Sequence, residues 1–249
     1  MSDILRIYCY GTCCVPDVWN GNQYGSMNRL YYIHNGKGGY MIDGVRHEFI
    51  PGRLYFFPYT TKYDLYSDSE DRINHTYANF ELVPPVISRK VISCEVSESE
   101  MTRRALEVFI EGGKLCTQGK LQIKTRNSDL HKLCFSAITY LTSAVVASSP
   151  EVKTADDSLV ICALETMHEN MDKQILVSEL ANSLYISTDN FIRRFKRCIG
   201  VTPYAYLRGL RLGSARYMLD EGKSLAQTAT AVGYSDASAL LHALGKMKS

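Results

Sequence analysis

The sequence predicts a multidomain protein of mixed α and β structure, with a β-barrel in its amino-terminal part and an all-α unit in its carboxy-terminal part. Three observations support this prediction. Residues 1–95 hold short β-branched and aromatic runs that are separated by turn residues. Residues 96–147 and 158–249 instead repeat apolar residues at helical spacing. The small, polar segment 148–157 between them has the composition of a linker.

The overall composition allows a large buried core and excludes a polycationic protein. The 249 residues are 45% apolar and carry a formal net charge of +2, so any basic function has to be local. The eight cysteines include no CxxC pair, and the opening MSDILRIYCY lacks the basic and apolar regions of a signal peptide. We therefore expect a cytoplasmic protein with free thiols rather than disulfides. No segment approaches the roughly 20 apolar residues of a membrane span, so no membrane partner is expected.

The first predicted elements are short strands that end at turn signals. In RLYYIHNGKGGYMIDGVRHEFIPGRLYFFP, the NGKGG, DG and PG sequences separate β-branched and aromatic runs at intervals that suit a sandwich or barrel. NHTYANFEL predicts a further strand. Because side chains alternate along a strand, His75 and Tyr77 should share one face. A binding pocket and a hydrogen-bonded core histidine beside a packing tyrosine both fit this pair.

Two amphipathic helices are predicted between the strands and the linker. The segment ESEMTRRALEVFIEGG should form the first, with GG as its stop, and NSDLHKLCFSAITYLTSAVVA the second. These helices could cap the β unit or pair with a second copy of the chain, and the sequence leaves both open. The apolar stripes comprise Met101, Ala105, Val108 and Phe109 in the first segment and Leu130, Leu133, Cys134, Ala137, Leu141 and Val145 in the second.

A helix-turn-helix arrangement with a basic outer face is predicted in residues 177–199. VSELANSLY has a short apolar stripe, YIS makes the turn, and Ser187 is a suitable N-cap for the next helix. On that second helix Asp189, Arg193 and Lys196 lie opposite the apolar face, with Arg197 beside them. Such a helix can enter a DNA major groove, where arginine donates two bonds to guanine. A solvated basic face on a structural helix is the alternative. The apolar face comprises Phe191, Phe195, Cys198 and Ile199.

The pattern then repeats after a linking helix. GVTP should end the basic helix at Gly200 in a left-handed conformation and start the next helix at Pro203. YAYLRGLRLGSARYML should bury Tyr206, Leu210, Ala215 and Leu219 or close neighbours, while Gly209 and Gly213 weaken it and suggest close helix packing or a hinge. Ser224 and Gln227 match a capping box, and a short alanine-rich helix then ends at VGY. Ser235 or Asp236 should cap the last helix, from Ala237.

These motifs together resemble the AraC-type (arabinose-regulator) transcription factor family. The resemblance covers about ninety carboxy-terminal residues closely and the first ninety more loosely. It implies a cupin-like, effector-binding β-barrel in residues 1–95, dimerisation helices in 96–147, a linker in 148–157 and a double helix-turn-helix DNA-binding domain in 158–249. The matching positions are Leu180, Ala181, Ser187, Phe191, Phe195, Lys196, Gly200, Pro203, Tyr206, Arg211, Ala215, Leu219, Gly233, Tyr234 and Ser235.

The resemblance implies a ligand-responsive, DNA-binding transcription regulator that senses a sugar or a related small molecule. Its expected partners are double-stranded DNA, a small-molecule effector, a second copy of the chain and RNA polymerase. The residues implied for DNA binding are Ser187, Thr188, Asp189, Ile192, Arg193, Lys196, Arg197, Ser238 and His242. Those implied for ligand binding are Trp19 and Tyr24 in the amino-terminal arm, Tyr63 after the FP dipeptide, and His75 with Tyr77.

No cofactor, metal or catalytic residue is expected, and the protein is not predicted to be an enzyme. A metal-binding cupin needs an H-x-H pair, a glutamate and a further histidine, whereas the barrel half offers only His34, His47 and His75. Tyr63 occupies the position where many relatives carry histidine. The rival prediction is a cupin-type binding module or enzyme with a degenerate DNA-binding domain. The basic helix face, combined with the missing metal ligands, favours the regulator.

The sequence departs from the family pattern in three places. The chain ends at LGKMKS, where family members continue with another aromatic residue and a GxxP stretch, so we expect a shortened carboxyl end. The last helix carries Ala237, Leu241 and His242 where relatives present polar and basic residues, and Leu244 replaces a usual phenylalanine. Leu176 stands where a capping serine or threonine is common. We therefore expect the first helix-turn-helix unit to carry nearly all sequence specificity.

Overall fold

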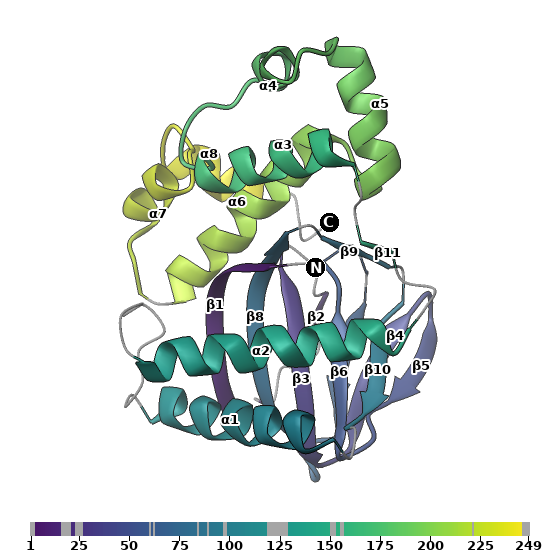
Figure 1. Ribbon diagram of the computed structural model, residues 1–249. Coiled ribbons are helices and arrows are strands. Elements are labelled where there is room, and N and C mark those ends of the chain that lie inside the picture. The colour runs from purple at the N-terminus through teal and green to yellow at the C-terminus, as the bar shows by residue number, and fades with distance from the viewer. Residues whose placement is uncertain are drawn as a thin grey trace. The chain divides into compact units, whose positions relative to one another are not determined.

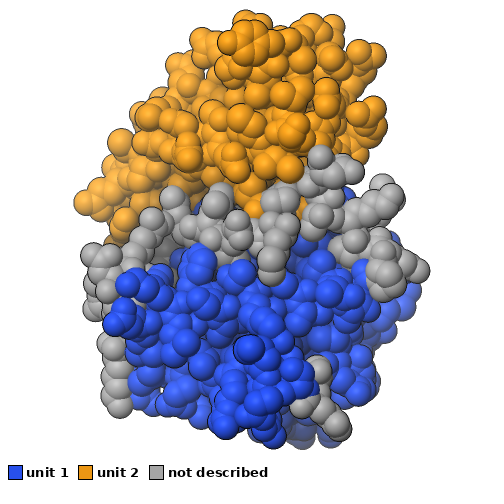
Figure 2. Space-filling view, in the orientation of Figure 1, with its two compact units in different colours: residues 1–82, 86–153 blue, residues 83–85, 154–249 orange. Residues whose placement is uncertain are grey.

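The chain divides into two compact units (Figure 2). The β-rich unit comprises Met1–Leu82 and Val86–Lys153, and the helical unit comprises Val83–Pro85 and Thr154–Ser249. The predicted combination of an antiparallel β-sheet domain with a carboxy-terminal helical domain is confirmed. The computed structural model describes residues 3–15, 21–22, 27–59, 61, 63–83, 85–88, 90–96, 99–118, 129–149, 153–154, 157–220 and 222–245.

The β-rich unit contains two antiparallel sheets (Figure 1). A five-stranded sheet has the order β1 (Asp3–Cys14), β8 (Asn74–Val83), β3 (Asn28–Asn35), β6 (Arg53–Phe57) and β10 (Ile92–Glu95). A four-stranded sheet has the order β2 (Gly21–Asn22), β7 (Asp64–Ser67), β4 (Gly38–Ile42) and β5 (Val45–Glu48). A short pairing joins β9 (Val86–Ile87) to β11 (Lys153–Thr154).

The predicted DG turn is a two-residue hairpin loop. Ile42 pairs with Val45, so Asp43 and Gly44 alone connect β4 to β5. Both residues have positive φ angles, 50° and 80°. This geometry belongs to the turn class whose twist matches that of the flanking strands, and it explains why the DG dipeptide signals a hairpin.

Side chains alternate in direction along the strands of the five-stranded sheet, so they form two faces. Both faces are buried. One face, with Leu30, Phe56 and Phe80, packs against α1 (Glu100–Thr117) and α2 (Asp129–Ala147). These two helices lie side by side across the sheet (Figure 1). The inner face packs toward the four-stranded sheet in an aromatic core. That core comprises Val15, Tyr31, Ile33, Tyr40, Phe49, Tyr55, Phe57, Tyr63, Leu65 and Ile73.

The GG pair does not end α1, contrary to the prediction, because the helix continues through it to Thr117. At Gly112, an added Cβ atom would lie 2.5 Å from the Tyr10 hydroxyl, and at Gly113 it would lie 2.7 Å from Thr12 Oγ1. The two glycines thus let α1 approach β1 closely. Packing outweighs their low helix propensity, which costs about 1 kcal/mol for each glycine relative to alanine.

The apolar stripes of α1 and α2 are only partly buried. Met101 is 65% exposed and Leu133 is 52% exposed, and Leu130 is exposed as well, so these three members of the predicted apolar stripes lie on the surface. Met101 and Leu130 lie in the first turns of α1 and α2, and Leu133 lies in the second turn of α2. The members of both stripes that join the core are Ala105, Phe109, Cys134, Ala137, Leu141 and Val145, with Val108 packed at its edge.

By length and composition alone, α2 could cross a membrane, with a mean hydropathy of 1.3 over its apolar window. This contradicts the expectation that no segment is apolar enough. In the folded unit one side of α2 lies in the core against α1 and the sheet. This core position accounts for the apolar residues on that side of α2, and 33% of the apolar window is buried.

The helical unit consists of the predicted series of helices. They are α3 (Ser158–Glu169), α4 (Val177–Ser183), α5 (Thr188–Ile199), α6 (Pro203–Asp220), α7 (Leu225–Ala231) and α8 (Ala237–Gly245). The predicted capping box is present, since Ser224 accepts from Gln227 N and Gln227 bonds back to Ser224 N. Asp236, rather than Ser235, caps α8 by accepting from Ala239 N at 2.8 Å.

Gly209→Ala in α6 is expected to stabilise the helical unit by about 0.5–1 kcal/mol. An added Cβ atom there meets nothing within 4 Å, so alanine adds helix propensity without a clash, and the close packing suggested for this glycine is absent. Gly113→Ala is the matched control, expected to destabilise the β-rich unit by about 1–3 kcal/mol through overpacking. Calorimetric unfolding of both variants should give shifts of opposite sign. Destabilisation by Gly209→Ala would indicate that this residue is needed as a hinge.

Candidate functional site

The turn between α4 and α5 has the geometry that the sequence predicts. Tyr185 lies in the left-handed region with a φ angle of 57°, so the chain reverses between the two helices. Ser187 then caps α5, and its hydroxyl accepts from Asn190 N at 3.4 Å. At the other end Gly200 adopts a φ angle of 88° and its N–H donates to the Lys196 carbonyl at 2.9 Å. These caps set both ends of α5.

One face of α5 lies in the core of the helical unit. Phe191, Phe195 and Ile199 are fully buried. The Phe195 ring packs against Phe191, with centroids 5.6 Å apart, and against Tyr206 of α6, with centroids 5.7 Å apart. Cys198 is only half-buried, so its assignment to the core face was too generous. These contacts hold the orientation of α5 and therefore determine which side chains its outer face presents.

The outer face of α5 is cationic. Arg193, Lys196 and Arg197 are exposed there, together with Asp189 in the first turn. Of the other residues predicted to bind DNA in this helix and its cap, Ser187 is exposed and Thr188 and Ile192 are half-buried. All seven predicted positions therefore lie outside the fully buried face of α5.

Arg194 has a structural role in spite of its place in the basic run. Its Nε donates to Asp157 Oδ2 at 2.5 Å. Asp157 is the N-cap of α3 and also accepts from Leu159 N and Val160 N. Burial acts to raise the pKa of Asp157, but the Arg194 hydrogen bond, the two N–H bonds and the arginine charge together hold it below its ordinary value. Arg194 therefore joins α5 to the start of α3.

Asp157→Ala is expected to destabilise the helical unit by about 1–2 kcal/mol, because it removes both a helix cap and an ion pair. The folded-state pKa of Asp157 is lowered, so its contribution is present above the unfolded pKa of about 4 and is lost as the pH falls through the folded pKa. Thermal unfolding of the wild type and variant should therefore differ at pH 7 and converge in acid. Asp157→Asn, which keeps a capping side chain, should cost less. An equal loss at pH 7 and in acid would contradict the ion-pair contribution.

The outer surface of α8 offers few polar groups. Ser238, Leu241 and His242 are exposed, while Leu240 and Ala243 are buried in a core with α6 and α7. His242 is the one titratable residue of the segment ASALLHALG. Compared with α5, this helix therefore has little capacity to bond base edges or phosphates.

Two of the predicted ligand-binding residues lie together on the inner face of the five-stranded sheet. His75 and Tyr77 are neighbours on β8, with ring centroids 5.3 Å apart, and His75 also meets Tyr31 edge-on at 4.9 Å. Burial lowers the pKa of His75 to about 4, so its imidazole is neutral near pH 7. Trp19 and Tyr24 lie outside the described residues.

Tyr63 is buried in the same aromatic core and contacts a residue that the sequence interpretation missed. Its hydroxyl accepts a hydrogen bond from Arg29 Nη1. Arg29 is only 8% exposed and pairs in register with Asn79 on β8. Strand alternation alone would have predicted that Arg29 faces the inner core. Arg29, Tyr31 and Ile33 alternate along β3 and so point to the same side, and Tyr31 and Ile33 face that core.

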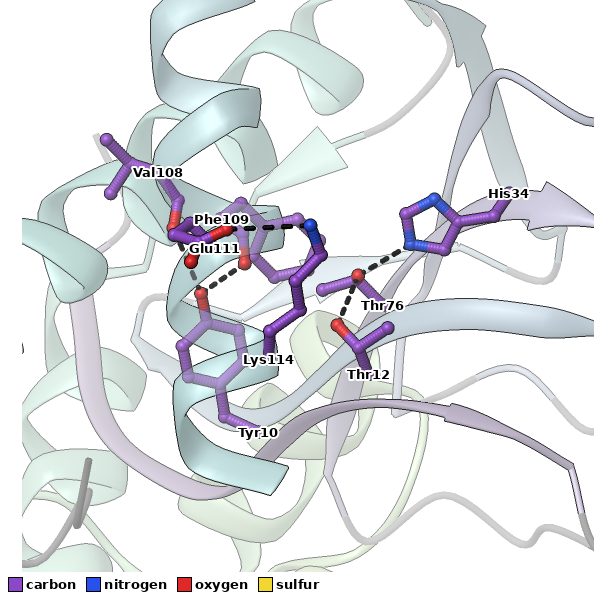
Figure 3. A network of polar contacts seen from close by, with 8 residues as sticks. All are labelled: Tyr10, Thr12, His34, Thr76, Val108, Phe109, Glu111 and Lys114. Carbon is purple, nitrogen blue, oxygen red and sulfur yellow. Dashed lines mark hydrogen bonds and ion pairs between the residues drawn. The ribbon is translucent and has the colours of Figure 1, made fainter. Parts of the chain in front are cut away.

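A polar network on the other face of the sheet connects the strands to α1 (Figure 3). His34 Nε2 lies 2.8 Å from Thr76 Oγ1, which lies 2.7 Å from Thr12 Oγ1. Nearby, the Tyr10 hydroxyl donates to the Phe109 carbonyl of α1. Because Thr76 and His75 point to opposite sides of β8, His34 and His75 lie on different faces. Among the described residues, no group of three His, Cys, Asp or Glu side chains is placed to hold a metal.

The comparisons with known proteins concern the helical unit most directly. A family model described as a helix-turn-helix domain matches residues 180–249. A protein of Streptomyces lividans described as an AraC-like transcription regulator is 35% identical over 85 residues, which cover 34% of this chain and 28% of that protein. Residues 180–249 form a helix-turn-helix domain. The HTH-type transcriptional regulator YbfI of Bacillus subtilis is 28% identical over 144 residues, or 56% of this chain and 48% of that protein.

The chain spans about half or less of the length of these two relatives. A crystal structure of ToxT from Vibrio cholerae resembles the whole fold, with a TM-score of 0.59 at 11% identity. That likeness covers 100% of this chain and 93% of the ToxT chain. Another ToxT structure, with a TM-score of 0.55 at 10% identity, is bound to an unsaturated fatty acid and covers 99% of this chain and 89% of that one. At such identities the similarity concerns the fold alone.

Proposed function

We propose that this chain is a ligand-responsive transcription regulator that binds double-stranded DNA through α5 and a small-molecule effector through its β-rich unit. The observation that carries the proposal is the division of α5 into a fully buried aromatic face and an exposed cationic face. Among the residues that the structure describes, Arg194 is the arginine of this helix that forms an ion pair, with Asp157. Arg193, Lys196 and Arg197 remain on the surface for an external anion.

Double-stranded DNA is the anion that suits this surface best. Arg193 lies opposite the Phe191 and Phe195 rings and would point toward base edges when α5 enters a major groove. Lys196 and Arg197, further along the helix, would pair with phosphates, which position a protein on DNA without reading its sequence. Ser187, Thr188, Asp189 and Ile192 would line the approach, and Ser238 and His242 of α8 would add a weaker second contact.

The effector proposal rests on the inner face of the β-rich unit. Tyr63, His75 and Tyr77 supply aromatic surface and polar groups there, and Trp19 and Tyr24 are proposed to join them. A sugar or a related small molecule is the proposed ligand. ToxT, which has a similar fold, binds an unsaturated fatty acid, so a fold of this kind accommodates small organic ligands.

A second copy of the chain is the proposed partner of α2. From Leu133 to Ala147 this helix holds no charged residue, and Leu133 leaves an exposed apolar side chain beside the buried stripe. Regulators that bind two half-sites gain affinity from such pairing, because the second contact becomes intramolecular. We place the dimerisation region in residues 96–147, the effector-binding barrel in residues 1–95, the linker in residues 148–157 and the DNA-binding domain in residues 158–249. A cytoplasmic regulator of this kind would act on RNA polymerase, and we propose no catalytic role for it.

The test is a titration of fluorescent DNA taken from upstream of the gene that encodes the chain, with a shuffled duplex of the same composition as the control. We expect tighter binding to the upstream DNA at all salt concentrations and a steep loss of affinity as salt increases. Equal affinity for both duplexes would show that the protein binds DNA without recognising its sequence. Absence of binding to either duplex at low salt would overturn the DNA-binding role.

A further inference from the structure

Tyr185, in the turn between α4 and α5, combines a strained backbone with an exposed side chain. Its φ angle is 57°, in the left-handed region, and the residue is 96% exposed. Left-handed backbone brings the Cβ atom of any residue but glycine close to a carbonyl oxygen, and bulky residues rarely adopt it. The fold therefore carries the cost of a tyrosine at this position without gaining any packing from its ring.

The backbone around Tyr185 shows what the turn itself requires. Tyr185 N donates to the Asn182 carbonyl at 3.0 Å, and Ile186 N donates to the Ala181 carbonyl at 3.2 Å. These two hydrogen bonds close α4 in a Schellman motif, in which Tyr185 is the first residue beyond the C-cap, Leu184. Glycine is the usual residue at that position, because it has no Cβ atom to clash. The tyrosine side chain takes part in neither hydrogen bond.

The second helix-turn-helix unit contains the same motif with glycine. At the end of α7, Gly233 N donates to the Thr230 carbonyl at 3.3 Å, and Tyr234 N donates to the Ala229 carbonyl at 2.9 Å. Gly233 has a φ angle of 78° and directly follows the C-cap of α7, as Tyr185 follows that of α4. Both helices have seven residues. The turn therefore forms with glycine, and the tyrosine of the first unit needs an explanation outside the fold.

Strained backbone of this kind concentrates at binding and active sites. Asp43 is the other non-glycine residue with a positive φ angle among the residues that the structure describes, and it needs no such explanation. Its two-residue hairpin loop requires that conformation, and the short polar side chain of aspartate tolerates it. Tyr185 has neither reason, so its strain points to a ligand.

The position of Tyr185 relative to α5 indicates which ligand this is. It lies two residues before Ser187, the N-cap of α5. The exposed cations of α5 are Arg193, Lys196 and Arg197. In helix-turn-helix proteins the second helix lies in the major groove and the first crosses the DNA backbone, so the turn that joins them comes close to the backbone. Tyrosine is among the side chains that donate to phosphate oxygens in protein–DNA complexes.

We propose that Tyr185 is a positioning residue for DNA binding, and that its hydroxyl donates a hydrogen bond to a backbone phosphate beside the groove that α5 enters. The strained turn holds the ring outward, and the phosphate contact fixes the register of α5 on the duplex. A tyrosine hydroxyl is an uncharged donor, so it releases no counterion from DNA, unlike Lys196 and Arg197. The inference rests on the proposed DNA-binding role of α5.

The test compares Tyr185→Phe with the wild type in titrations of the full chain with the upstream and shuffled duplexes. We expect affinity for both duplexes to fall about 3–10-fold, as for the loss of one hydrogen bond. The specificity ratio and the slope of log affinity against log salt concentration should stay at their wild-type values, because the lost contact is uncharged and reads no base. Tyr204→Phe, at an exposed position on α6, is the matched control and should bind like the wild type.

Three outcomes of these titrations overturn the inference. Unchanged affinity of Tyr185→Phe would show that the hydroxyl does not contact DNA. A changed specificity ratio would show that the hydroxyl reads a base rather than a phosphate. An equal loss in Tyr204→Phe would show that the effect is not particular to the α4–α5 turn.

Tyr185→Gly separates the role in DNA binding from any role in the fold. Glycine relieves the left-handed strain, and this outweighs the freedom that it adds to the unfolded chain. The melting temperature of the helical unit should therefore rise by about 2–5 °C, while affinity for both duplexes falls at least as far as in Tyr185→Phe. A lower melting temperature would show that the tyrosine supports the fold and would overturn the inference.

A variant of α5 distinguishes failure of this inference from failure of the proposed function. If the wild type binds neither duplex, the DNA-binding role is lost, and the role of Tyr185 with it. If the wild type binds DNA and Lys196→Ala weakens that binding while Tyr185→Phe does not, the DNA-binding role of α5 stands and the assignment of Tyr185 alone is wrong.

Discussion

Leu141→Asp is expected to unfold the β-rich unit, because it places a carboxylate in the middle of the core that α2 shares with the five-stranded sheet. Leu141 is fully buried there among Phe56, Phe80 and Phe109 in the same core. Removing a buried leucine side chain alone costs about 2–5 kcal/mol, and an unpaired buried charge adds several more. The sum is comparable to the whole stability of a domain, about 5–15 kcal/mol. We expect loss of the cooperative unfolding transition of the unit in circular dichroism.

Leu133→Asp is the matched control on the exposed side of the same helix. Leu133 is 52% exposed, so the charge can remain in water and the unit should keep its fold. If α2 pairs with a second copy, this variant should sediment as a folded monomer at concentrations where the wild type is a dimer. A folded Leu133→Asp dimer would place the interface elsewhere, and a folded Leu141→Asp variant would contradict the core position.

Arg193→Ala is expected to weaken binding to the preferred DNA by about 1–3 kcal/mol while changing binding to shuffled DNA little. The side chain lies on the exposed face of α5, opposite the Phe191–Phe195 contact, so its removal leaves the packing of the helix intact. Competition titrations with the two duplexes give the specificity ratio directly. A ratio equal to that of the wild type, in a protein with unchanged thermal unfolding, would show that Arg193 reads no base.

Two sets of variants serve as controls for this prediction. Lys196→Ala and Arg197→Ala should each weaken binding to all sequences alike. Each should also reduce the slope of log affinity against log salt concentration by about one, because each removes one phosphate contact. His242→Ala should change the specificity ratio less than Arg193→Ala, because the exposed side chains of α8 are those of Ser238, Leu241 and His242. Equal losses from His242→Ala and Arg193→Ala would show that the second helix-turn-helix unit reads DNA as strongly as the first.

The sequence by itself determined the elements whose ends depend on local chemistry. Ser187, Gly200 and the Ser224–Gln227 capping box mark helix ends because their side chains, or the absence of one, satisfy backbone groups within a few residues. The DG hairpin follows for the same reason. The exposed positions of Arg193, Lys196 and Arg197 followed from helical periodicity alone, since apolar residues occupy the opposite side of α5.

Only the tertiary structure decided which of these local signals prevail. Gly112 and Gly113 look like a helix stop, yet they lie within α1, because the contact with β1 needs residues without side chains. Arg194 looks like its basic neighbours, yet Asp157, 37 residues away in sequence, holds it within the unit. Arg29 lies beside Asn79 because strand register pairs β3 with β8, and a side-chain hydrogen bond joins it to Tyr63, 34 residues away in sequence. Contacts between distant residues depend on packing, and a local pattern contains no information about the partner.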